Sequence, residues 1–369
     1  MSTVAVGRPL PSRVVVTAHR LRLGGLSRYL VEHANAILRC GIDTRVVVPR
    51  SEAAEFVGDS FAGVTYVVDR LRAQDVLRAL GTNRAGVVRL VTGRAPPDTR
   101  LAAALALRRV ALIESIHQPA TRPGIRLGRR VFYALRPKRR YWCFGFTKGM
   151  QQHLLEYVPS LRSRIRCVRE GVDLLGYRPA PGERGPGPIR IGSLSRLDEF
   201  QKDHATLLRA ARCLRDRSIE FELTIGGDGQ DRTMLEQLAD ALGVTDRVRF
   251  AGWVNDPQAF MHRHDIFVNS TRFESFGRTN IEAAASALPV VASRVLGCVE
   301  TVEHEFGGLL VEPDSPESLA DAIERLVKDS TLRESLARNA IHFAQGFTMD
   351  VHTRALFDAC GFAIPGCKH

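Results

Sequence analysis

The chain lacks the features of a membrane-spanning or exported protein. No apolar run among its 369 residues approaches the ~18 residues of a membrane span, and the longest candidate, Ala283 to Ser293, stops at 11. Its first residues, Met1 to Pro11, contain no apolar core of the kind that a signal peptide requires. We therefore expect the protein to stay in the cytoplasm.

The chain also lacks the spacings of disulfide-linked and metal-binding proteins. Its seven cysteines are an odd number and stand singly, with no Cys-x-x-Cys pair, which argues against a disulfide framework and a zinc site. Nor does the chain contain an Asp-x-Asp sequence, or His, Cys and Asp residues at metal-ligand spacing. A reducing compartment fits this pattern, and we expect no metal to be required.

Charge is divided unevenly between the two halves of the chain. Residues 1–188 hold 32 Lys and Arg against 13 Asp and Glu, a net of +19, whereas residues 189–369 hold 20 against 27, a net of −7. A genome rich in G and C inflates Arg, which outnumbers Lys 47 to 5, but that bias should act on both halves alike. Because a basic surface attracts phosphates, nucleic acid or an anionic bilayer, the halves are expected to meet different partners.

Strands and helices alternate in both halves, which predicts an α/β fold with parallel sheets covered by helices. A chain of this length suits two domains. The segment Pro179 to Pro188, in which Pro and Gly supply seven of ten residues, is the predicted linker. We therefore predict two doubly wound Rossmann-like domains, residues 1–180 and 181–348, facing across a cleft and followed by a helical segment, 349–369.

The elements expected in each half can be read from apolar runs and periodicity. The expected strands are 13–19, 44–49, 63–68, 87–91, 111–117, 141–147, 165–168, 189–195, 221–226, 248–251, 266–270 and 289–293. The expected helices are 26–39, 75–80, 98–109, 148–157, 205–215, 232–242, 257–262, 281–287, 316–327 and 349–359.

Two carboxylates bracket one predicted strand-to-helix turn. A predicted helix with an Ala-rich start follows the strand Asp265 to Ser270. Glu274 lies before this helix, and Glu282 lies within its start. Ligands of parallel α/β sheets lie outside the carboxyl ends of strands, where free N–H groups bind phosphate and carboxylates can accept hydroxyl protons from a ribose or a sugar. The free N–H groups expected there belong to Phe276, Gly277 and Arg278.

Cations and glycines occupy other predicted strand-to-helix loops. The loop Ser195 to Lys202 carries Arg196 and Lys202. The Arg guanidinium offers a fork of N–H donors and the Lys ammonium a compact point charge, and together they could neutralise a diphosphate. Gly24 and Gly25, and the run Gly226 to Gly229, lack Cβ atoms and could let a phosphate approach the backbone. Neither glycine loop extends to a nucleotide-triphosphatase or dinucleotide-binding motif, so those classes lose their main support.

These segments resemble the retaining glycosyltransferases of the two-domain fold called GT-B, in particular family four, the glycosyl transferases group 1. Glu274 to Glu282 resembles the family's Glu-x7-Glu motif, and Ser195 to Lys202 its Gly-Arg-Leu…Lys-Gly segment. Gly226 to Gly229 is similar to its Gly-x-Gly segment. The resemblance is dense over residues 189–312 and thin over 1–188.

The resemblance implies an N-terminal acceptor domain, a C-terminal nucleotide-sugar domain and a last segment that crosses back to the first domain. It implies that Glu274 touches the transferred sugar, that Glu282 holds the ribose, and that His117 reaches the sugar near the reacting carbon. The candidate catalytic residues are His117, Glu274, Arg196 and Lys202. The candidate nucleotide-sugar-binding residues are Gly24, Gly25, Arg196, Lys202, Gly227, Phe276, Gly277, Arg278 and Glu282.

The resemblance further implies a reaction on one face of the sugar, with the leaving phosphate taking the acceptor proton, no cofactor and no metal. The chain departs from the family pattern in five places. Ser195 and Asp203 flank the cation loop where the family has a small residue and Gly, and Ala287 stands where the family usually has Gly. Glu170 replaces an Asn near the linker, and Gly297 to Glu300 only approximates Gly-Gly-x-x-Glu.

The acceptor is less defined by the sequence than the donor. Residues 126–140 hold seven cations interleaved with apolar residues, a pattern that can lie on an anionic membrane. Because this segment falls in the expected acceptor domain, we favour a membrane-held acceptor for a cell-surface polysaccharide or glycolipid, which would place the protein on the inner face of the membrane.

Other readings stay open at this stage. They are transfer to a small soluble natural product, epimerisation of the nucleotide sugar by the same two-domain plan, and an inactive nucleotide-sugar-binding subunit. A nucleic-acid partner is disfavoured, because the chain has no aromatic-basic RNA motif and its acidic half carries the clearest site.

Overall fold

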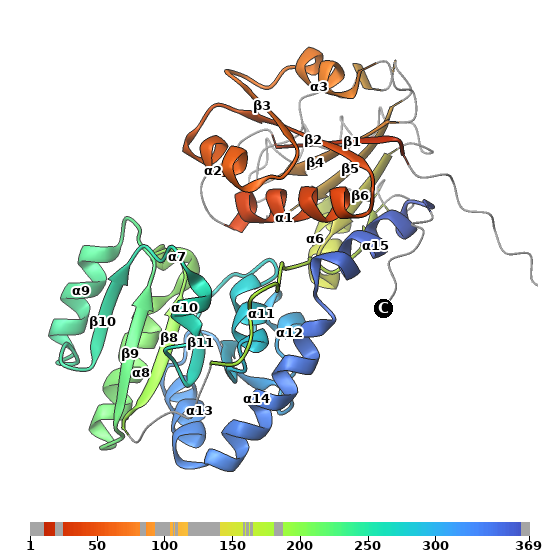
Figure 1. Ribbon diagram of the computed structural model, residues 1–369. Helices are drawn as coiled ribbons and strands as arrows, with labels where there is room; N and C mark the ends of the chain where they lie inside the picture. Colours follow the sequence, from red (N-terminus) through yellow and green to blue (C-terminus); the bar gives the residue numbers. More distant parts are fainter. Residues whose placement is uncertain are drawn as a thin grey trace, which may run out of the picture. The chain divides into compact units, whose positions relative to one another are not determined.

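The computed structural model divides the chain into two compact units. The first combines Met1–Asp173 with Thr348–His369, and the second is the continuous stretch Leu174–Phe347 (Figure 1). The residues that the structure describes are 11–18, 25–81, 86–92, 104–105, 107, 110–116, 141–157, 159, 162, 165–180 and 187–362.

The first unit is built on a parallel sheet with seven strands in the described part of the chain, in the order β3-β2-β1-β4-β5-β6-β7. These strands are β1 (Arg13–Ala18), β2 (Asp43–Pro49), β3 (Val64–Val68), β4 (Gly86–Thr92), β5 (Ala111–Ile116), β6 (Tyr141–Gly145) and β7 (Ile165–Cys167). Val14, Val15 and Val16 of β1 are fully buried, as expected for a parallel strand covered by helices on both faces.

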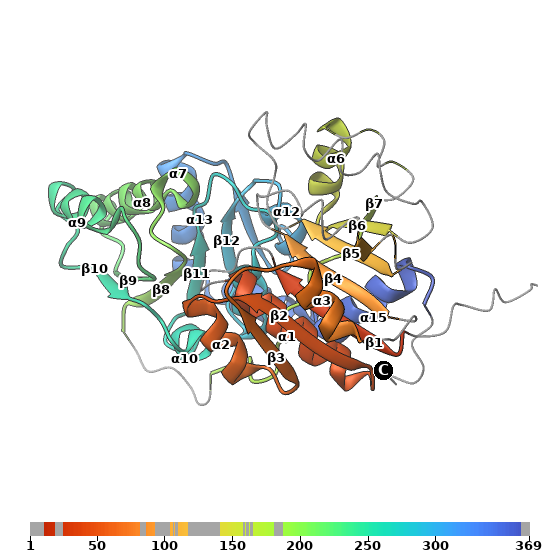
Figure 2. The ribbon, with the colours of Figure 1, turned by 90° about the horizontal axis from the view of Figure 1, so that it is seen from above.

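The helices described in the first unit include one from the far end of the chain. They are α1 (Gly25–Arg39), α2 (Glu52–Ser60), α3 (Ala73–Leu80), α6 (Lys148–Tyr157) and α15 (Met349–Ala359). Helix α15 packs against α1, as Figures 1 and 2 show, and Tyr29 Oη lies 2.8 Å from His352 Nε2 in this interface. An ion pair from Arg39 to Asp350, 2.9 Å long, adds a contact at the surface.

The second unit is built on a six-stranded parallel sheet in the order β10-β9-β8-β11-β12-β13. Its strands are β8 (Ile189–Leu194), β9 (Phe221–Gly226), β10 (Val248–Gly252), β11 (Ile266–Asn269), β12 (Val290–Ser293) and β13 (Gly308–Val311). Its helices are α7 (Glu199–Lys202), α8 (His204–Asp216), α9 (Arg232–Ala241), α10 (Pro257–Met261), α11 (Arg278–Ala285), α12 (Cys298–Thr301), α13 (Pro316–Lys328) and α14 (Ser330–Gln345).

Helices cover both faces of this sheet. Residues of α8, α9 and α13 share one apolar core with inward residues of β8, β9 and β11, among them Leu208, Leu235 and Ile323. Residues of α10, α11 and α12 share another with β11 and β12. Figure 2 shows α8, α9 and α13 on one side of the sheet and α10 on the other.

The predicted α/β class with parallel sheets is confirmed, and strands β1 to β12 begin and end within about two residues of their predicted limits, whereas β13 was not predicted. The sequence reading missed four helices: α2, α7, α12 and α14. It also started α11 at Ile281, whereas the helix begins at Arg278, directly after the turn residue Gly277.

Two of the departures from the family pattern lie at left-handed backbone positions. Asp203 has φ 50° and Ala287 has φ 60°, a conformation that glycine adopts without the steric cost met by residues with a Cβ. Asp203 compensates by capping α8, since its Oδ1 accepts from Thr206 N. Ala287 has a methyl group that offers no such compensation.

We therefore expect Ala287→Gly to stabilise the second unit by about 0.5–1 kcal/mol, because relief of the left-handed strain should exceed the entropy that glycine adds to the unfolded chain. Ala322→Gly, within helix α13, is the matched control and should destabilise by about 1 kcal/mol. Urea unfolding followed by circular dichroism measures both. A loss of stability in Ala287→Gly would contradict the strain argument.

Candidate functional site

The predicted site residues of the second unit lie where the order of its strands reverses. Strand β8 pairs with β9 on one side and with β11 on the other, so the loops after β8 and β11 leave neighbouring carboxyl ends of the sheet. This reversal is where open α/β sheets bind ligands. The loop after β8 carries Arg196 and Lys202, and the loop after β11 carries Glu274.

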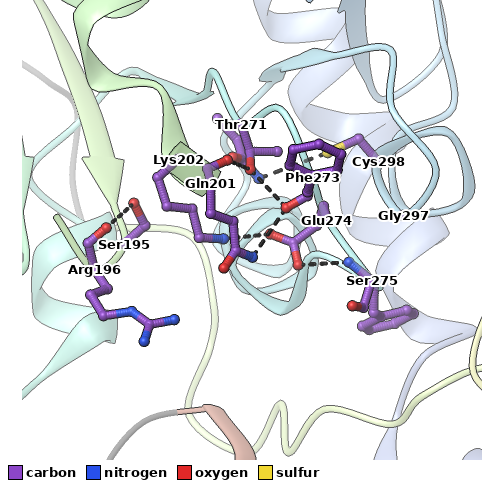
Figure 3. A network of polar contacts seen from close by, with 12 residues as sticks. Ser195, Arg196, Gln201, Lys202, Thr271, Phe273, Glu274, Ser275, Gly297 and Cys298 are labelled. Atoms are coloured by element: carbon purple, nitrogen blue, oxygen red, sulfur yellow. Dashed lines mark hydrogen bonds and ion pairs between the residues drawn. The ribbon is translucent and has the colours of Figure 1, made fainter. Parts of the chain in front are cut away.

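An ion pair joins these two loops. Lys202 Nζ donates to Glu274 Oε2 at 2.6 Å, and the two side chains are only 14% and 13% exposed (Figure 3). The other carboxylate oxygen, Glu274 Oε1, accepts from Ser275 N at 3.1 Å. The predicted catalytic cation and carboxylate are therefore in direct contact and largely shielded from solvent.

Backbone hydrogen bonds hold the two loops in register. The carbonyl of Gln201 accepts from Arg272 N at 2.9 Å and from Thr271 Oγ1 at 2.7 Å. The side chain of Gln201 in turn donates from Nε2 to Phe273 O at 3.1 Å. Gln201, which directly precedes Lys202, is thus bonded to Phe273, which directly precedes Glu274, as Figure 3 shows.

The turn into α11 depends on two glycines. Gly277 has φ 96° and caps the helix in the left-handed conformation, and a Cβ there would lie 2.9 Å from Asn280 Nδ2. Gly297 donates to Glu274 O at 2.9 Å, and a Cβ on it would lie 2.6 Å from Phe276 N. Close backbone packing therefore sets the position of Glu274 and of the helix start.

The start of α11 offers unsatisfied donors. In the described part of the chain, no protein acceptor binds the backbone N–H of Phe276 or Gly277. The Phe276 ring is buried and packs against Phe347, 5.8 Å between centroids. Of Phe276, only the N–H group is therefore suited to hold a ligand, and such groups at a helix N-terminus favour anions.

Arg196 is exposed and has no hydrogen-bond or ion-pair partner for its guanidinium within the residues described here. In Figure 3 its guanidinium lies apart from the Lys202–Glu274 pair, and no dashed line reaches it. A free cation beside a shielded one leaves Arg196 able to reach an incoming anion.

Gly227 supports the cation loop through its backbone. It has φ 119°, and a Cβ on it would lie 1.8 Å from Ser195 O. Its N–H donates to Gly252 O at 2.7 Å, while Leu197 N donates to Asp228 O at 3.0 Å. The glycine loop therefore packs directly on the segment that carries Arg196, and binding of a nucleotide by Gly227 itself stays a prediction.

The remaining predicted site residues lie in helix α11, in the first unit or outside the described residues. Glu282 lies in α11 and is 5% exposed, and Arg278, the first residue of α11, is half-buried. Gly25 begins α1 in the first unit. Gly24 and His117 lie outside the described residues, as does the basic segment 126–140, so their predicted roles stay predictions.

The sequence reading missed a charged network beneath the cation loop. Arg272 Nη2 donates to the fully buried Asp203 at 2.6 Å, and its Nη1 donates to Glu199 O at 2.8 Å. Burial and the neighbouring Asp203 raise the pKa of Glu199 to about 7. The one available signal was the replacement of the family's Gly by Asp203, which brings an acid into a buried turn.

A buried histidine also lies behind the loop. His204 Nε2 lies 3.0 Å from Ser195 Oγ, and burial, together with the charge of Lys202, lowers the pKa of His204 to about 4. His204 is therefore neutral at physiological pH. Cys298, buried near Glu274, has a pKa raised to about 12 by burial and by that carboxylate, so its thiol is not a nucleophile.

The described residues contain neither a cluster of metal ligands nor a membrane-spanning helix. Within the part of the chain that the structure covers, no group of three or more His, Cys, Asp or Glu could hold a metal ion. Among the helices described, none has the length and apolar character needed to cross a bilayer.

A family model matches most of the second unit. Residues 180–343 match the model described as glycosyl transferases group 1. The predicted resemblance to the glycosyl transferases group 1 is therefore confirmed over this part of the chain, which contains the Lys202–Glu274 pair.

Curated relatives and solved structures agree with this match. D-inositol 3-phosphate glycosyltransferase of Salinispora tropica is 32% identical over 243 residues, 59% of this chain and 50% of the relative. The lipopolysaccharide core biosynthesis glycosyltransferase LpsE of Rhizobium meliloti is 41% identical over 111 residues, 30% of this chain and 33% of that relative. The chain thus spans half or less of the length of these relatives.

The solved structures share the fold at low identity. A glycosyltransferase from Rickettsia africae has a TM-score of 0.81 at 16% identity, covering 94% of this chain and 97% of its own. Anabaena HepE, solved in complex with UDP, has a TM-score of 0.76 at 19% identity, covering 94% and 98%. The predicted GT-B fold is confirmed.

A double-mutant cycle tests the shielded ion pair. Lys202→Met and Glu274→Gln should each destabilise the second unit by about 1–3 kcal/mol, because each leaves a shielded charge without its partner. The double variant should recover at least about 0.5–1 kcal/mol of the summed loss. The exposed pair Arg212–Asp216 is the control, with an expected coupling of about 0.3–0.5 kcal/mol. Equal coupling in both cycles would show that shielding adds nothing.

Proposed function

We propose that the chain is a retaining glycosyltransferase that moves a sugar from a nucleoside diphosphate sugar to an acceptor hydroxyl without a metal. The observation that carries the proposal is the shielded Lys202–Glu274 pair at the strand reversal, within the region that matches the glycosyl transferases group 1 model.

Diphosphate binding follows from the donors that converge there. The Lys202 ammonium has three donors and can bind a phosphate oxygen while it holds Glu274. Arg196 can add a forked contact, and the N–H groups of Phe276 and Gly277, which no acceptor in the described part of the chain binds, can add two backbone donors. These groups would offset the negative charge that grows on the diphosphate as it leaves. Glu282 would accept from the ribose hydroxyls.

Transfer proceeds on one face of the sugar in this proposal. The bond from the anomeric carbon to the diphosphate oxygen breaks, the acceptor oxygen bonds to the same face, and the leaving phosphate oxygen takes the acceptor proton. Glu274 contacts the sugar, and His117 is proposed to contact it from the first unit. Cys298, held as a neutral thiol, does not provide a covalent alternative.

The acceptor is proposed from charge and from the relatives' names. The first half of the chain carries a net of +19, which suits an anionic acceptor or one held at an anionic membrane. One relative is named for D-inositol 3-phosphate and another for the lipopolysaccharide core. We propose an anionic or lipid-linked acceptor in the assembly of a polysaccharide or glycolipid, with the protein in the cytoplasm at the inner membrane face.

A panel of nucleotide sugars, incubated with and without candidate acceptors, tests the activity. Release of free nucleotide only with an acceptor indicates transfer. A changed sugar still joined to its nucleotide indicates an epimerase, binding without reaction indicates an inactive subunit, and turnover only with small soluble acceptors indicates a natural-product transferase.

Substitutions at the cation loop should separate binding from chemistry. We expect Lys202→Ala and Glu274→Ala to lower turnover by about a hundredfold or more, since each removes a group that contacts the reacting region. Arg196→Ala should mainly raise the Kd for the nucleoside diphosphate. Arg209→Ala, an exposed position on α8, is the control and should leave both unchanged. Full activity in Lys202→Ala and Glu274→Ala together would refute the proposed site.

The membrane part of the proposal has its own test. Because attraction of a basic segment to anionic lipid is screened by salt, the chain should pellet with vesicles containing anionic lipid at low salt and be released at high salt. Replacing Arg136, Lys138, Arg139 and Arg140 by Gln should weaken pelleting without changing nucleotide binding. Pelleting that changes neither with salt nor with these substitutions would contradict the proposed binding to an anionic membrane surface.

A further inference from the structure

The four-residue helix α7, which ends in Lys202, is held at both ends by one side chain. Arg272 Nη1 donates to Glu199 O at the first residue of α7, at 2.8 Å. Its Nη2 donates to Asp203 Oδ1, directly after the helix, at 2.6 Å, and its Nε pairs with Asp314. An isolated helix of one turn has no stability of its own, so the position of Lys202 depends on these contacts.

Asp203 has one satisfied and one unsatisfied oxygen. The residue is fully buried, and Oδ1 accepts from both Arg272 and Thr206 N. Oδ2 is buried and has no donor among the described groups when every carboxyl is ionised. The Glu199 carboxyl, however, faces the same guanidinium, with Oε1 3.7 Å from Arg272 Nη1, and interacts with the Asp203 carboxyl as a hydrogen-bonding neighbour. Two carboxylates accept hydrogen bonds only, so this contact requires a proton on one of them.

The surrounding charges favour one shared proton. The carboxyl groups of Glu199 and Asp203 face a single cation, Arg272, which is also shared with Asp314. From the neighbouring loop, Asp231 Oδ2 accepts from Glu199 N at 2.8 Å, which adds another negative group. His204, the first residue of α8, is neutral, and Lys202 directs its charge to Glu274. Burial raises the pKa of both Glu199 and Asp203, and that of Glu199 reaches about 7.

We propose that Glu199 and Asp203 share one proton and, together with Arg272, form a positioning latch that fixes Lys202 and that loosens when the proton is lost. Glu199 holds the proton and donates it to Asp203 Oδ2, which satisfies the buried oxygen. Loss of the proton would leave two like charges in contact, that of Asp203 fully buried and that of Glu199 only 18% exposed, and would weaken the hold on α7. The link to phosphate binding rests on the proposed function, whereas the shared proton does not.

The direction of the pH effect follows from linkage. The pKa of Glu199 is raised in the folded protein from its ordinary value of 4.5 to about 7. The folded state therefore binds the proton more tightly than the unfolded state. The stability that this provides is fully present below about pH 4.5 and is lost as the pH rises through about 7.

The first experiment measures the shared proton without any ligand. In a Trp142→Phe background, Trp253 reports unfolding of the second unit alone. Between about pH 5 and about pH 8, the unfolding equilibrium constant of the parent should rise by about tenfold or more relative to that of Glu199→Gln. The Gln amide keeps a donor toward Asp203 without a titrating proton. Glu334→Gln, an exposed control, should follow the parent.

The second experiment measures the latch through nucleotide binding. UDP and GDP are titrated calorimetrically into the full chain and into Glu199→Gln at about pH 6 and about pH 8. Comparing the two proteins at one pH removes the ionisation of the phosphate itself. Their Kd values should agree at pH 6, whereas at pH 8 Glu199→Gln should bind about fivefold more tightly or better. Asp203→Asn, which also removes the shared proton, should likewise flatten the pH profile.

The outcomes separate the latch from the proposed function. Parallel unfolding profiles for the parent and Glu199→Gln would overturn the shared proton. A pH-dependent unfolding difference with nucleotide affinities that do not differ at pH 8 would overturn the positioning of Lys202. Absence of nucleotide binding at every pH would overturn the proposed function and the link to it, while the unfolding comparison would still decide the shared proton.

Discussion

The contact between Lys202 and Glu274 is the interaction on which the candidate site depends. It joins two loops that follow neighbouring strands, and each loop is irregular on its own. A cation or a carboxylate this well shielded would lower the stability of the folded state if it had no partner. The pair therefore holds both loops in one arrangement. The helix start, the free amides and the exposed Arg196 are positioned relative to that arrangement.

Close backbone contacts make the arrangement possible. Gly227 and Gly297 allow main chain to lie against main chain where any side chain would collide. The Gln201 hydrogen bonds then fix α7 to the loop that carries Glu274. The charged groups therefore rest on a frame of amide and carbonyl contacts, which explains why a short loop helix can present a lysine with a defined direction.

Part of this structure could be predicted from the sequence because its signals are local. Buried parallel strands such as β1 and β11 are short apolar runs, and the carboxylates and cations stand directly after such runs. The start of α11 was displaced because Gly277, not apolar periodicity, sets where that helix begins. Helix α14 was missed because Leu336, Ala340 and Ala344 give it only a narrow buried stripe of mostly small side chains.

The network beneath the cation loop is not local. Arg272 and Asp203 are 69 residues apart in sequence, and their contact exists only because Asp203 adopts a left-handed conformation that turns its carboxyl inward. No pattern of spacing encodes such a meeting. The sequence showed only that an acid stands at a glycine position, and its partner became evident when the strands were placed in order.

The path of the chain has a consequence for biosynthesis. The second unit is one uninterrupted stretch, whereas the first is completed only by α15, which follows it. Domains emerging from the ribosome usually fold in order from the amino end. Here the later unit can be finished first, while the earlier one waits with the interface of Tyr29 uncovered until His352 has been made. Nascent chains of this protein therefore pass through a period in which the second unit is mature and the first unit is still open to chaperones.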